Sequence, residues 1–301
     1  MFQSSVRTKA ILQATFVTVL WSTSWVLIKL TLNDLPPLVF AGLRYSLATI
    51  FLLPGVLREG KQFKAISNRD WFQLIALGIM FYTITQGGQF LTLNYLNAST
   101  FSLLLNFSSI IVAILGIFLI REVPSLLQWI GIVIFMIGVM FFFFPLGGDN
   151  SNPIGVIFAA VTVIANAISS LLGRKINRAK ELSPALVTGL SMGVGSVILL
   201  AIGVAVEGFP KLSIVNALVI LWLAVVNTAF AFHLWNQSLR ELSAVESSLI
   251  NNSMLIQIAF LAWVFLGERL MLRQVIALGV AVLGIIMTNI GLPGWLKKGK
   301  D

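Results

Sequence analysis

The sequence predicts an all-α membrane protein of ten transmembrane helices, arranged as two inverted five-helix repeats with both termini cytoplasmic. Apolar residues make up 58% of the 301 residues and charged residues 10%, against about 25% charged residues in an ordinary soluble domain. The mean hydropathy of +0.96 leaves too little polar surface to cover one globular core. At roughly 20 apolar residues per crossing, the chain has room for about ten helices and for no large extramembrane domain.

Charge clusters and Pro/Gly punctuation divide the chain into apolar spans. We expect these spans at residues 10–31, 37–57, 71–94, 98–120, 125–144, 153–174, 184–206, 214–239, 244–266 and 272–292. The first span follows a basic segment like that of a signal peptide, but its apolar run has no small-residue cleavage site. We therefore expect it to remain as an uncleaved span.

The positions of the basic residues predict the orientation of the spans. With the N-terminus inside, fifteen Lys and Arg fall in inner segments and three, Lys211, Arg269 and Arg273, fall in outer loops. Lys29 and Arg44 remain within spans. Because basic loops are retained in the cytoplasm, both termini are expected there. The same rule explains the net charge of +9, which in a soluble protein would suggest a nucleic-acid partner, and no such partner is expected here.

The second half of the chain repeats the first at a shift of 146 residues. Polar residues match in this frame, and in a membrane protein polar matches arise by chance less often than apolar matches. The aligned pairs include Asn106 with Asn252, Glu122 with Glu268, Gln128 with Gln274 and Gly138 with Gly284. A shift of 147 aligns Pro37 with Pro184 and Gly42 with Gly189. We expect repeats at residues 1–146 and 147–301, each with five spans, so that the second repeat lies inverted. Inverted repeats that meet at a central site are typical of secondary transporters.

Three short motifs accompany the repeats. They are Trp21-Ser-Thr-Ser-Trp25-x3-Lys29, Arg44 early in the second span, and the charged groups Arg121-Glu122 and Gly267-Glu268-Arg269. Together these features resemble the drug/metabolite transporter superfamily, and within it the EamA-type transporters, over nearly the whole chain. The resemblance implies export, often of amino acids or related metabolites, through a central cavity built from both repeats. Unlike many of these relatives, the chain has no proline directly after Asn106 or Asn252.

Trp21, Trp25 and Lys29 lie four residues apart on one stripe of the first span. The stripe predicts an aromatic cavity wall with a cation near its outer end, where a carboxylate or a cation–π partner could bind. Trp21 lies near the middle of the span, away from an interfacial aromatic belt, which favours the cavity for both tryptophans. For Lys29, a side chain that snorkels to the interface is an equally open interpretation.

Arg44 lies seven residues after Pro37, roughly 10 Å into the second span. It shares the outer half of the membrane with Lys29, and no acidic residue lies near them within a span. Because a charge inside a span needs a partner or a cavity, we expect an anionic or carboxylate-bearing solute there. A structural role, with Arg44 bonded to helix-end carbonyls, is the alternative.

The third and eighth spans carry most of the remaining polar candidates. We predict substrate-binding roles for Tyr82, Gln86 and Gln89 in the third span and for Asn227, His233 and Asn236 in the eighth. His233 is also the candidate for proton coupling, with a simple hydrogen bond to a neighbouring helix as the alternative. Asn106 and Asn252 are further candidates, although their symmetry favours a role in helix packing.

The residue types argue against several other functions. With no cysteine and one histidine, neither a metal site nor another cofactor is expected, and no nucleophile–base pair indicates an enzyme. The chain also lacks a phosphate-binding loop and a channel selectivity filter.

The acidic residues bear on energy coupling. All eleven lie in loops or within about a turn of a span end, whereas proton-coupled pumps usually place carboxylates mid-membrane. We expect exchange or facilitated diffusion, or coupling through His233 alone. The leading hypothesis is a monomeric secondary transporter of the cytoplasmic membrane that exports amino acids or related carboxylate-bearing or zwitterionic metabolites. The alternative is a facilitative, channel-like permease or exchanger for drugs or cations.

Overall fold

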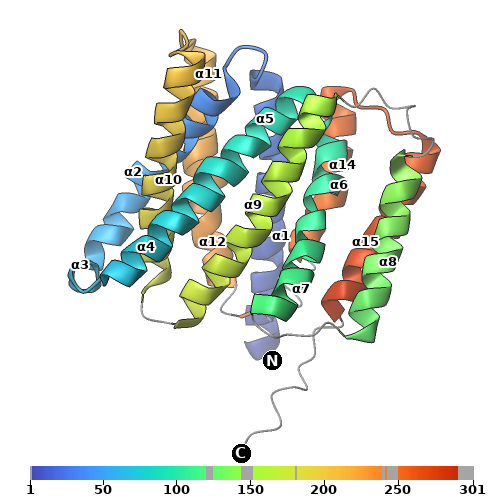
Figure 1. The fold of residues 1–301 in the computed structure, drawn as a ribbon, viewed down its shortest axis with the longest axis horizontal. Coiled ribbons are helices and arrows are strands. Elements are labelled where there is room, and N and C mark those ends of the chain that lie inside the picture. The colour runs from blue at the N-terminus through green and yellow to red at the C-terminus, as the bar shows by residue number, and fades with distance from the viewer. Residues whose placement is uncertain are drawn as a thin grey trace, which may run out of the picture. The chain divides into compact units, whose positions relative to one another are not determined.

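The structure is a computed structural model that describes residues 2–119, 125–143, 152–179, 182–238, 241–242 and 250–290. Within these ranges every regular element is a helix and no strand occurs (Figure 1). The all-α class predicted from the sequence is confirmed. The Arg121-Glu122 pair of the sequence motif lies outside the described residues.

Most of the described helices begin and end close to the predicted span limits, although α1 begins before the first predicted span and α3 lies outside every predicted span. They are α1 (Phe2–Thr31), α2 (Pro37–Arg58), α3 (Gly60–Lys64), α4 (Asn68–Leu77), η1 (Gly78–Gln86), α5 (Gly87–Tyr95), α6 (Ala98–Leu105), α7 (Phe107–Leu119), α8 (Leu126–Phe143), α9 (Pro153–Ala179), α10 (Pro184–Glu207), α11 (Ile214–Ala224), η2 (Val225–Phe230), α12 (Ala231–Ser238), α14 (Met254–Leu266) and α15 (Leu272–Ile290).

Seven of the described helices are long and apolar enough to cross a membrane. Three shorter apolar helices, Ala98–Val112, Ile250–Leu266 and Leu272–Met287, occupy the positions of the fourth, ninth and tenth predicted spans. Ten crossings and the cytoplasmic position of both termini stay predictions.

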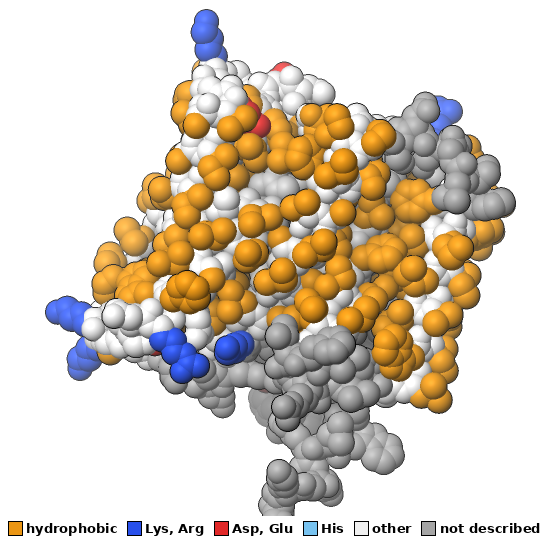
Figure 2. All heavy atoms as spheres, viewed as in Figure 1, with side chains coloured by type: hydrophobic (Ala, Val, Ile, Leu, Met, Phe, Trp, Pro, Cys, Tyr) orange, Lys and Arg blue, Asp and Glu red, His pale blue; other side chains and the backbone are white. Residues whose placement is uncertain are grey.

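Exposed side chains on these helices are largely apolar. Leu126 on α8 is 77% exposed and Ile214 on α11 is 81% exposed. In Figure 2, hydrophobic side chains cover most of the visible helix surfaces, whereas Lys and Arg side chains lie near helix ends. Such a surface suits contact with hydrocarbon, and helices suit a bilayer because they satisfy their own backbone hydrogen bonds.

The chain forms two compact units, and each unit takes helices from both predicted repeats. Unit 1 comprises Met1–Ser22, Ala113–Asn150 and Leu234–Asp301, and unit 2 comprises Thr23–Val112 and Ser151–His233. The contact units therefore do not coincide with the two sequence halves. The boundaries predicted for the repeats, at residues 1–146 and 147–301, stay a prediction.

In unit 1, α8 and α15 lie side by side (Figure 1) and approach closely at two glycines. A Cβ at Gly138 would lie 2.6 Å from Ala281 N and 2.9 Å from Ala277 O, and a Cβ at Gly284 would lie 2.6 Å from Gly131 O. The shift of 146 that aligns Gly138 with Gly284 also aligns Gly131 with Ala277. Gly138 thus meets Ala277, and Gly284 meets the equivalent residue, Gly131, so the shift exchanges the two contacts. Antiparallel helices related by a two-fold axis show this pattern.

In unit 2, α2 and α10 form a second antiparallel pair. A Cβ at Gly42 would lie 2.6 Å from Leu200 Cα, and one at Gly203 would lie 2.7 Å from Val39 N. The backbones touch at these points because glycine has no side chain to separate them.

Polar side chains close both ends of this second pair. Glu207 accepts hydrogen bonds from Leu38 N and Val39 N, each at 3.0 Å to Oε2, where a carboxylate favours a helix N-terminus. At the opposite end, Gln62 Oε1 accepts a hydrogen bond from Ser183 N at 3.0 Å. Residues from both predicted repeats therefore hold α2 and α10 together.

Two π-helical segments interrupt the third and eighth predicted spans, and no feature of the sequence predicted them. η2 lies within residues 224–232, the range equivalent to η1 at a shift of 146. Threonine hydroxyls donate to carbonyls five residues earlier, from Thr85 to Met80 O and from Thr228 to Leu223 O, both at 2.8 Å. π-Helical turns are rare and occur often at functional sites.

The fourth and ninth predicted spans are each interrupted near the middle, although no proline is present there. Asn106 separates α6 from α7, and Ser253 separates helical residues 250–252 from α14. Both interruptions use tighter hydrogen bonds, from Asn106 N to Leu103 O at 3.2 Å and from Ser253 N to Ile250 O at 3.2 Å. Ser253 is equivalent to Asn106 at a shift of 147. Helical turns closed by such i to i−3 bonds mark these interruptions.

Candidate substrate-binding site

Among the described residues, Arg44 is the single charged side chain that is buried, with 4% of it exposed. It lies on α2 within unit 2. Its Nε donates a hydrogen bond to Thr228 Oγ1 of η2 at 3.2 Å, and this is the one hydrogen bond that it makes within the described residues. No described carboxylate forms an ion pair with it.

The guanidinium of Arg44 lies over the aromatic ring of Tyr45. The Arg44 Cζ lies 5.0 Å from the centre of the Tyr45 ring, within cation–π range. The Tyr45 hydroxyl donates to Gln86 Oε1 at 2.7 Å, and the Tyr82 ring packs against the Tyr45 ring at a centroid distance of 5.7 Å. Arg44, Tyr45, Tyr82, Gln86 and Thr228 therefore form one contiguous group, which we name the Arg44 cluster.

The Arg44 cluster leaves the two terminal nitrogens of the guanidinium, Nη1 and Nη2, without an acceptor among the described residues. A charge within a membrane span is costly and is usually found paired or facing a cavity. Parallel Nη hydrogen bonds match the two oxygens of a carboxylate. The arrangement can therefore bind a carboxylate whose charge replaces the missing counter-ion.

Asn227, next to Thr228 on η2, is completely buried. Its Nδ2 donates to Thr23 Oγ1 of α1 at 3.2 Å. The π-helical segment η2 thus connects α1 through Asn227 and α2 through Thr228. Of the polar residues predicted in the third and eighth spans, Tyr82 and Gln86 belong to the Arg44 cluster, whereas Asn227 lies next to Thr228 in the sequence and bonds α1.

The predicted stripe on α1 divides between the two units. In unit 2, Trp25 is buried against Phe101, with ring centres 5.1 Å apart. In unit 1, Trp21 packs against Trp235 with ring centres 5.2 Å apart. Both tryptophans are engaged with aromatic neighbours, and their role in substrate binding stays a prediction.

Lys29 donates through Nζ to two backbone carbonyls at the end of α5. One acceptor is Leu96 O at 2.8 Å and the other is Leu93 O. Carbonyls in the last turn of a helix lack intrahelical partners, and a cation satisfies them well. This geometry favours a structural interpretation for Lys29, and its predicted contact with substrate stays untested.

The other predicted residues lie apart from the Arg44 cluster or outside the description. Gln89 is half-buried on α5 and makes no hydrogen bond to another described residue. Asn106 donates from Nδ2 to Ser102 O at 2.7 Å at the α6–α7 interruption, and Asn252 is half-buried just before α14. His233 is exposed in unit 2, and the side chain of Asn236 lies outside the described residues.

The sequence interpretation missed Tyr45, Thr228 and Gln257. Thr228 is equivalent to Tyr82 at a shift of 146, a signal that could have found it. Gln257, in unit 1, donates from Nε2 to Thr18 Oγ1 at 3.1 Å and to Ser253 Oγ at 2.8 Å, and it accepts from Ser22 Oγ at 3.0 Å. With its donors and acceptor used, this amide ties α1 to α14 as interhelical polar contacts do in membranes.

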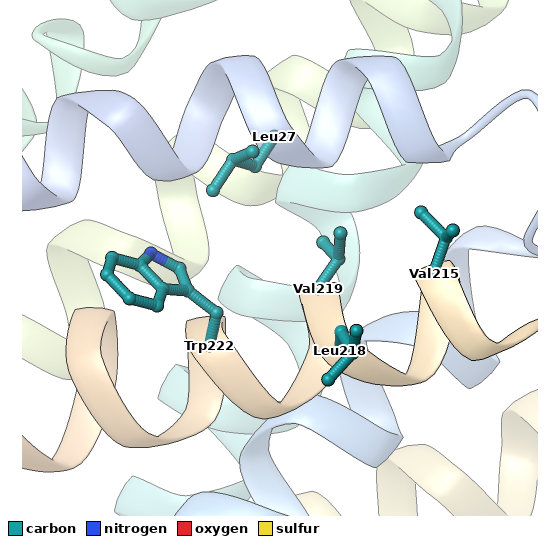
Figure 3. Close-up of a pocket in the computed structure, with 5 residues that line it drawn as sticks. All are labelled: Leu27, Val215, Leu218, Val219 and Trp222. Carbon is teal, nitrogen blue, oxygen red and sulfur yellow. The ribbon is translucent and has the colours of Figure 1, made fainter.

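One groove on unit 2 has a different chemistry. It has a volume of about 350 Å³ and is lined by Leu27 of α1 and by Val215, Leu218, Val219 and Trp222 of α11. In Figure 3, Leu27 lies opposite Val219 and Trp222 across the groove. The lining is almost wholly apolar, with the indole N–H of Trp222 as its one side-chain donor, and it carries no charge to pair with a carboxylate. In the same described ranges no group of three or more His, Asp or Glu side chains could hold a metal.

The long apolar helices, paired within each unit by close backbone contacts, define a multi-pass membrane protein. The chain belongs to the EamA-like transporter family. The family model matches residues 8–144 and, a second time, residues 153–290. The resemblance inferred from the sequence motifs is confirmed.

Similar proteins from bacteria are transporters by name. The chain is 23% identical over 290 residues to the uncharacterized transporter YoaV of Bacillus subtilis, covering 93% of this chain and 97% of that one. It is 24% identical to the S-adenosylmethionine/S-adenosylhomocysteine transporter of Chlamydia muridarum, covering 88% and 86%. It is 23% identical to the uncharacterized inner membrane transporter YedA of Escherichia coli, covering 91% and 88%.

A solved crystal structure shares the fold. It superposes with a TM-score of 0.66 at 17% sequence identity and covers 94% of this chain and 98% of its own. At this identity the likeness describes the fold alone. Family and relatives together make the chain a membrane transporter of small solutes.

Proposed function

We propose that the protein is a secondary transporter that exports small carboxylate-bearing solutes, amino acids or related metabolites, across the cytoplasmic membrane by alternating access. The observation that carries this proposal is Arg44, a buried guanidinium whose two Nη groups have no described acceptor. A solute carboxylate would supply both the counter-charge and the missing hydrogen bonds.

The paired features of the two halves support the transport mechanism. The glycine contacts of α8 and α15 exchange under the 146-residue shift, and π-helical segments and helix interruptions recur at equivalent places. These features are those expected of ten spans in two inverted repeats; the cytoplasmic position of both termini rests on the distribution of Lys and Arg in the sequence. Inverted repeats can exchange conformations and so open a central site to either side in turn.

The proposed energetics is exchange or facilitated diffusion. No acidic residue of the sequence lies in the middle of a predicted span, so a carboxylate proton carrier of the usual kind is missing. His233 is the alternative carrier. Uphill movement of substrate driven by a pH gradient, if it persisted in the His233→Ala variant, would contradict both versions.

The test is a counterflow screen in proteoliposomes. Vesicles loaded with one unlabelled solute are diluted into the same labelled solute, and the panel contains L-amino acids, aromatic carboxylates, S-adenosylmethionine and lipophilic or quaternary ammonium cations. S-adenosylmethionine is included because a relative of C. muridarum carries its name. We expect exchange of one or more carboxylate-bearing solutes and little exchange of simple cations.

Arg58 provides the matched control for Arg44. It lies at the exposed end of the same helix, α2, so Arg58→Gln removes the same charge from outside the cluster. Arg44→Gln should abolish carboxylate exchange, whereas Arg58→Gln should retain it. Preferential exchange of cations, undiminished in Arg44→Gln, would instead support the alternative of a permease or exchanger for drugs or cations.

A further inference from the structure

The hydroxyl of Thr228 has a fixed direction. It donates its single proton to Leu223 O at 2.8 Å, five residues earlier along the chain. A hydroxyl has one proton and two lone pairs, so a bonded proton leaves an oxygen that can only accept. That oxygen faces Arg44 Nε at 3.2 Å.

The π-helical turn makes this arrangement possible. In an α-helix a threonine hydroxyl bonds the carbonyl three or four residues earlier, whereas in η2 (Val225–Phe230) it reaches the fifth. The wider turn therefore selects both the acceptor of Thr228 and the direction of its lone pairs. Thr228 is completely buried, so water does not compete for this geometry.

The bond to Thr228 determines which N–H groups of the Arg44 guanidinium remain available to bind a carboxylate. A guanidinium can bind a carboxylate side-on, through Nε and one Nη, or end-on, through both Nη groups. Because Nε is bonded to Thr228, a carboxylate can bind only end-on, through both Nη groups. Tyr45, 5.0 Å below the guanidinium carbon, limits rotation of the guanidinium plane out of this position.

We propose that Thr228 is a positioning residue that directs the two Nη groups of Arg44 toward the carboxylate of the transported solute. This inference rests on the proposed function, because it assumes that Arg44 binds a carboxylate. It adds a residue that the solute does not touch and a defined, end-on mode of recognition. Selectivity for a carboxylate over its amide then depends on Thr228 as well as on Arg44.

The experiment compares acids with their amides in the Thr228→Val and Thr228→Ser variants. Valine has nearly the shape of threonine without the hydroxyl, and serine keeps the hydroxyl. Counterflow of labelled L-leucine, L-phenylalanine or L-methionine is measured with the unlabelled acid or its amide as competitor. An amide has one carbonyl oxygen in place of the two carboxylate oxygens, and its NH2 group has no lone pair to offer the guanidinium cation. It therefore reports binding without the pair of Nη hydrogen bonds.

We expect Thr228→Val to raise the half-saturation concentration of the acid roughly five- to tenfold, the size of one ordinary hydrogen bond, because the Nη groups remain present but are no longer held in position. The maximal rate should change little, and the inhibition constant of the amide should stay the same, so that the acid-to-amide preference falls. Thr228→Ser should restore the preference. A purely structural role would instead weaken acid and amide equally.

Thr92→Val is the matched control. Thr92 is also completely buried, and its hydroxyl donates to Gly88 O at 2.7 Å within its own helix, away from the Arg44 cluster. It should leave the preference unchanged. An unchanged preference in Thr228→Val, while Arg44→Gln abolishes exchange of the acid, overturns this inference and leaves the proposed function standing. No exchange of any acid by the wild-type protein, or a preference that survives Arg44→Gln, overturns the proposed function itself.

Discussion

The glycine contacts between α8 and α15 allow a quantitative test of the repeat. Alanine at Gly138 would place a Cβ 2.6 Å from Ala281 N and 2.9 Å from both Ala277 O and Ala281 Cα. All three atoms belong to the backbone, and optimal contacts between carbon atoms lie at about 3.5–4.0 Å. The helices must therefore separate by about 1 Å, because no flexible side chain can give way.

The expected cost follows from this separation. Overpacking costs about 1–3 kcal/mol, and contact with backbone atoms alone places this site at about 2–3 kcal/mol. The better helix propensity of alanine returns about 1 kcal/mol. Gly138→Ala should therefore lower the free energy of unfolding by about 1–2 kcal/mol. Gly284→Ala should cost a similar amount, because its Cβ would meet the equivalent backbone of α8, 2.6 Å from Gly131 O.

Gly279, on the exposed face of α15, is the matched control. A Cβ there would have nothing within 4 Å, so Gly279→Ala should be neutral or stabilising. Unfolding in mixed micelles with increasing sodium dodecyl sulfate, followed by tryptophan fluorescence, measures all three variants. The reasoning is refuted if Gly138→Ala or Gly284→Ala is as stable as wild type, or if Gly279→Ala is equally destabilised.

Two further predictions concern orientation and Lys29. Because the natural chain has no cysteine, Lys64→Cys and Lys211→Cys report the two sides separately. A membrane-impermeant maleimide should label Lys211→Cys in intact cells and Lys64→Cys only after permeabilisation, and the reverse pattern would contradict the orientation. Lys29→Met should lower the stability by about 1–3 kcal/mol, since it leaves Leu96 O without its donor. It should keep the acid-to-amide preference, whereas a lost preference would place the ammonium beside the substrate.

Span positions were predictable because hydrocarbon imposes a strong pattern. The second predicted span, 37–57, differs by one residue from α2, and the seventh, 184–206, differs by one residue from α10. Proline and charge mark these ends in the sequence itself. The 146-residue shift also aligned Gly138 with Gly284, which the structure places in equivalent helix contacts.

The backbone irregularities were not predictable from residue types. η1 and η2 contain the same apolar and small polar residues as the α-helices around them, so nothing in composition separates a π turn from an α turn. The interruptions at Asn106 and Ser253 have no proline. They depend on local hydrogen bonds that form only in the folded chain.

The site was predictable in part, because polar residues are conspicuous within the apolar pattern that hydrocarbon imposes. Arg44, Tyr82 and Gln86 stood out as polar groups within apolar spans, and the structure brings all three into the Arg44 cluster. Tyr45 does not stand out in a sequence with many aromatic residues. Thr228 can accept from Arg44 only because the π-helical turn of η2 directs its hydroxyl proton to Leu223 O. A residue that acts through the geometry of another has no signature of its own in a single sequence.

Equilibrium binding tests the central claim most directly, because it does not depend on turnover or coupling. A labelled amino acid that exchanges in the screen is titrated onto detergent-solubilised wild-type, Arg44→Gln and Arg58→Gln proteins. Hydrogen bonds to charged groups contribute about 1.5–3 kcal/mol each, so Arg44→Gln should weaken binding by at least tenfold. The Arg58→Gln protein should bind like wild type. Equal affinity in the wild-type and Arg44→Gln proteins would contradict the claim that Arg44 holds the solute carboxylate.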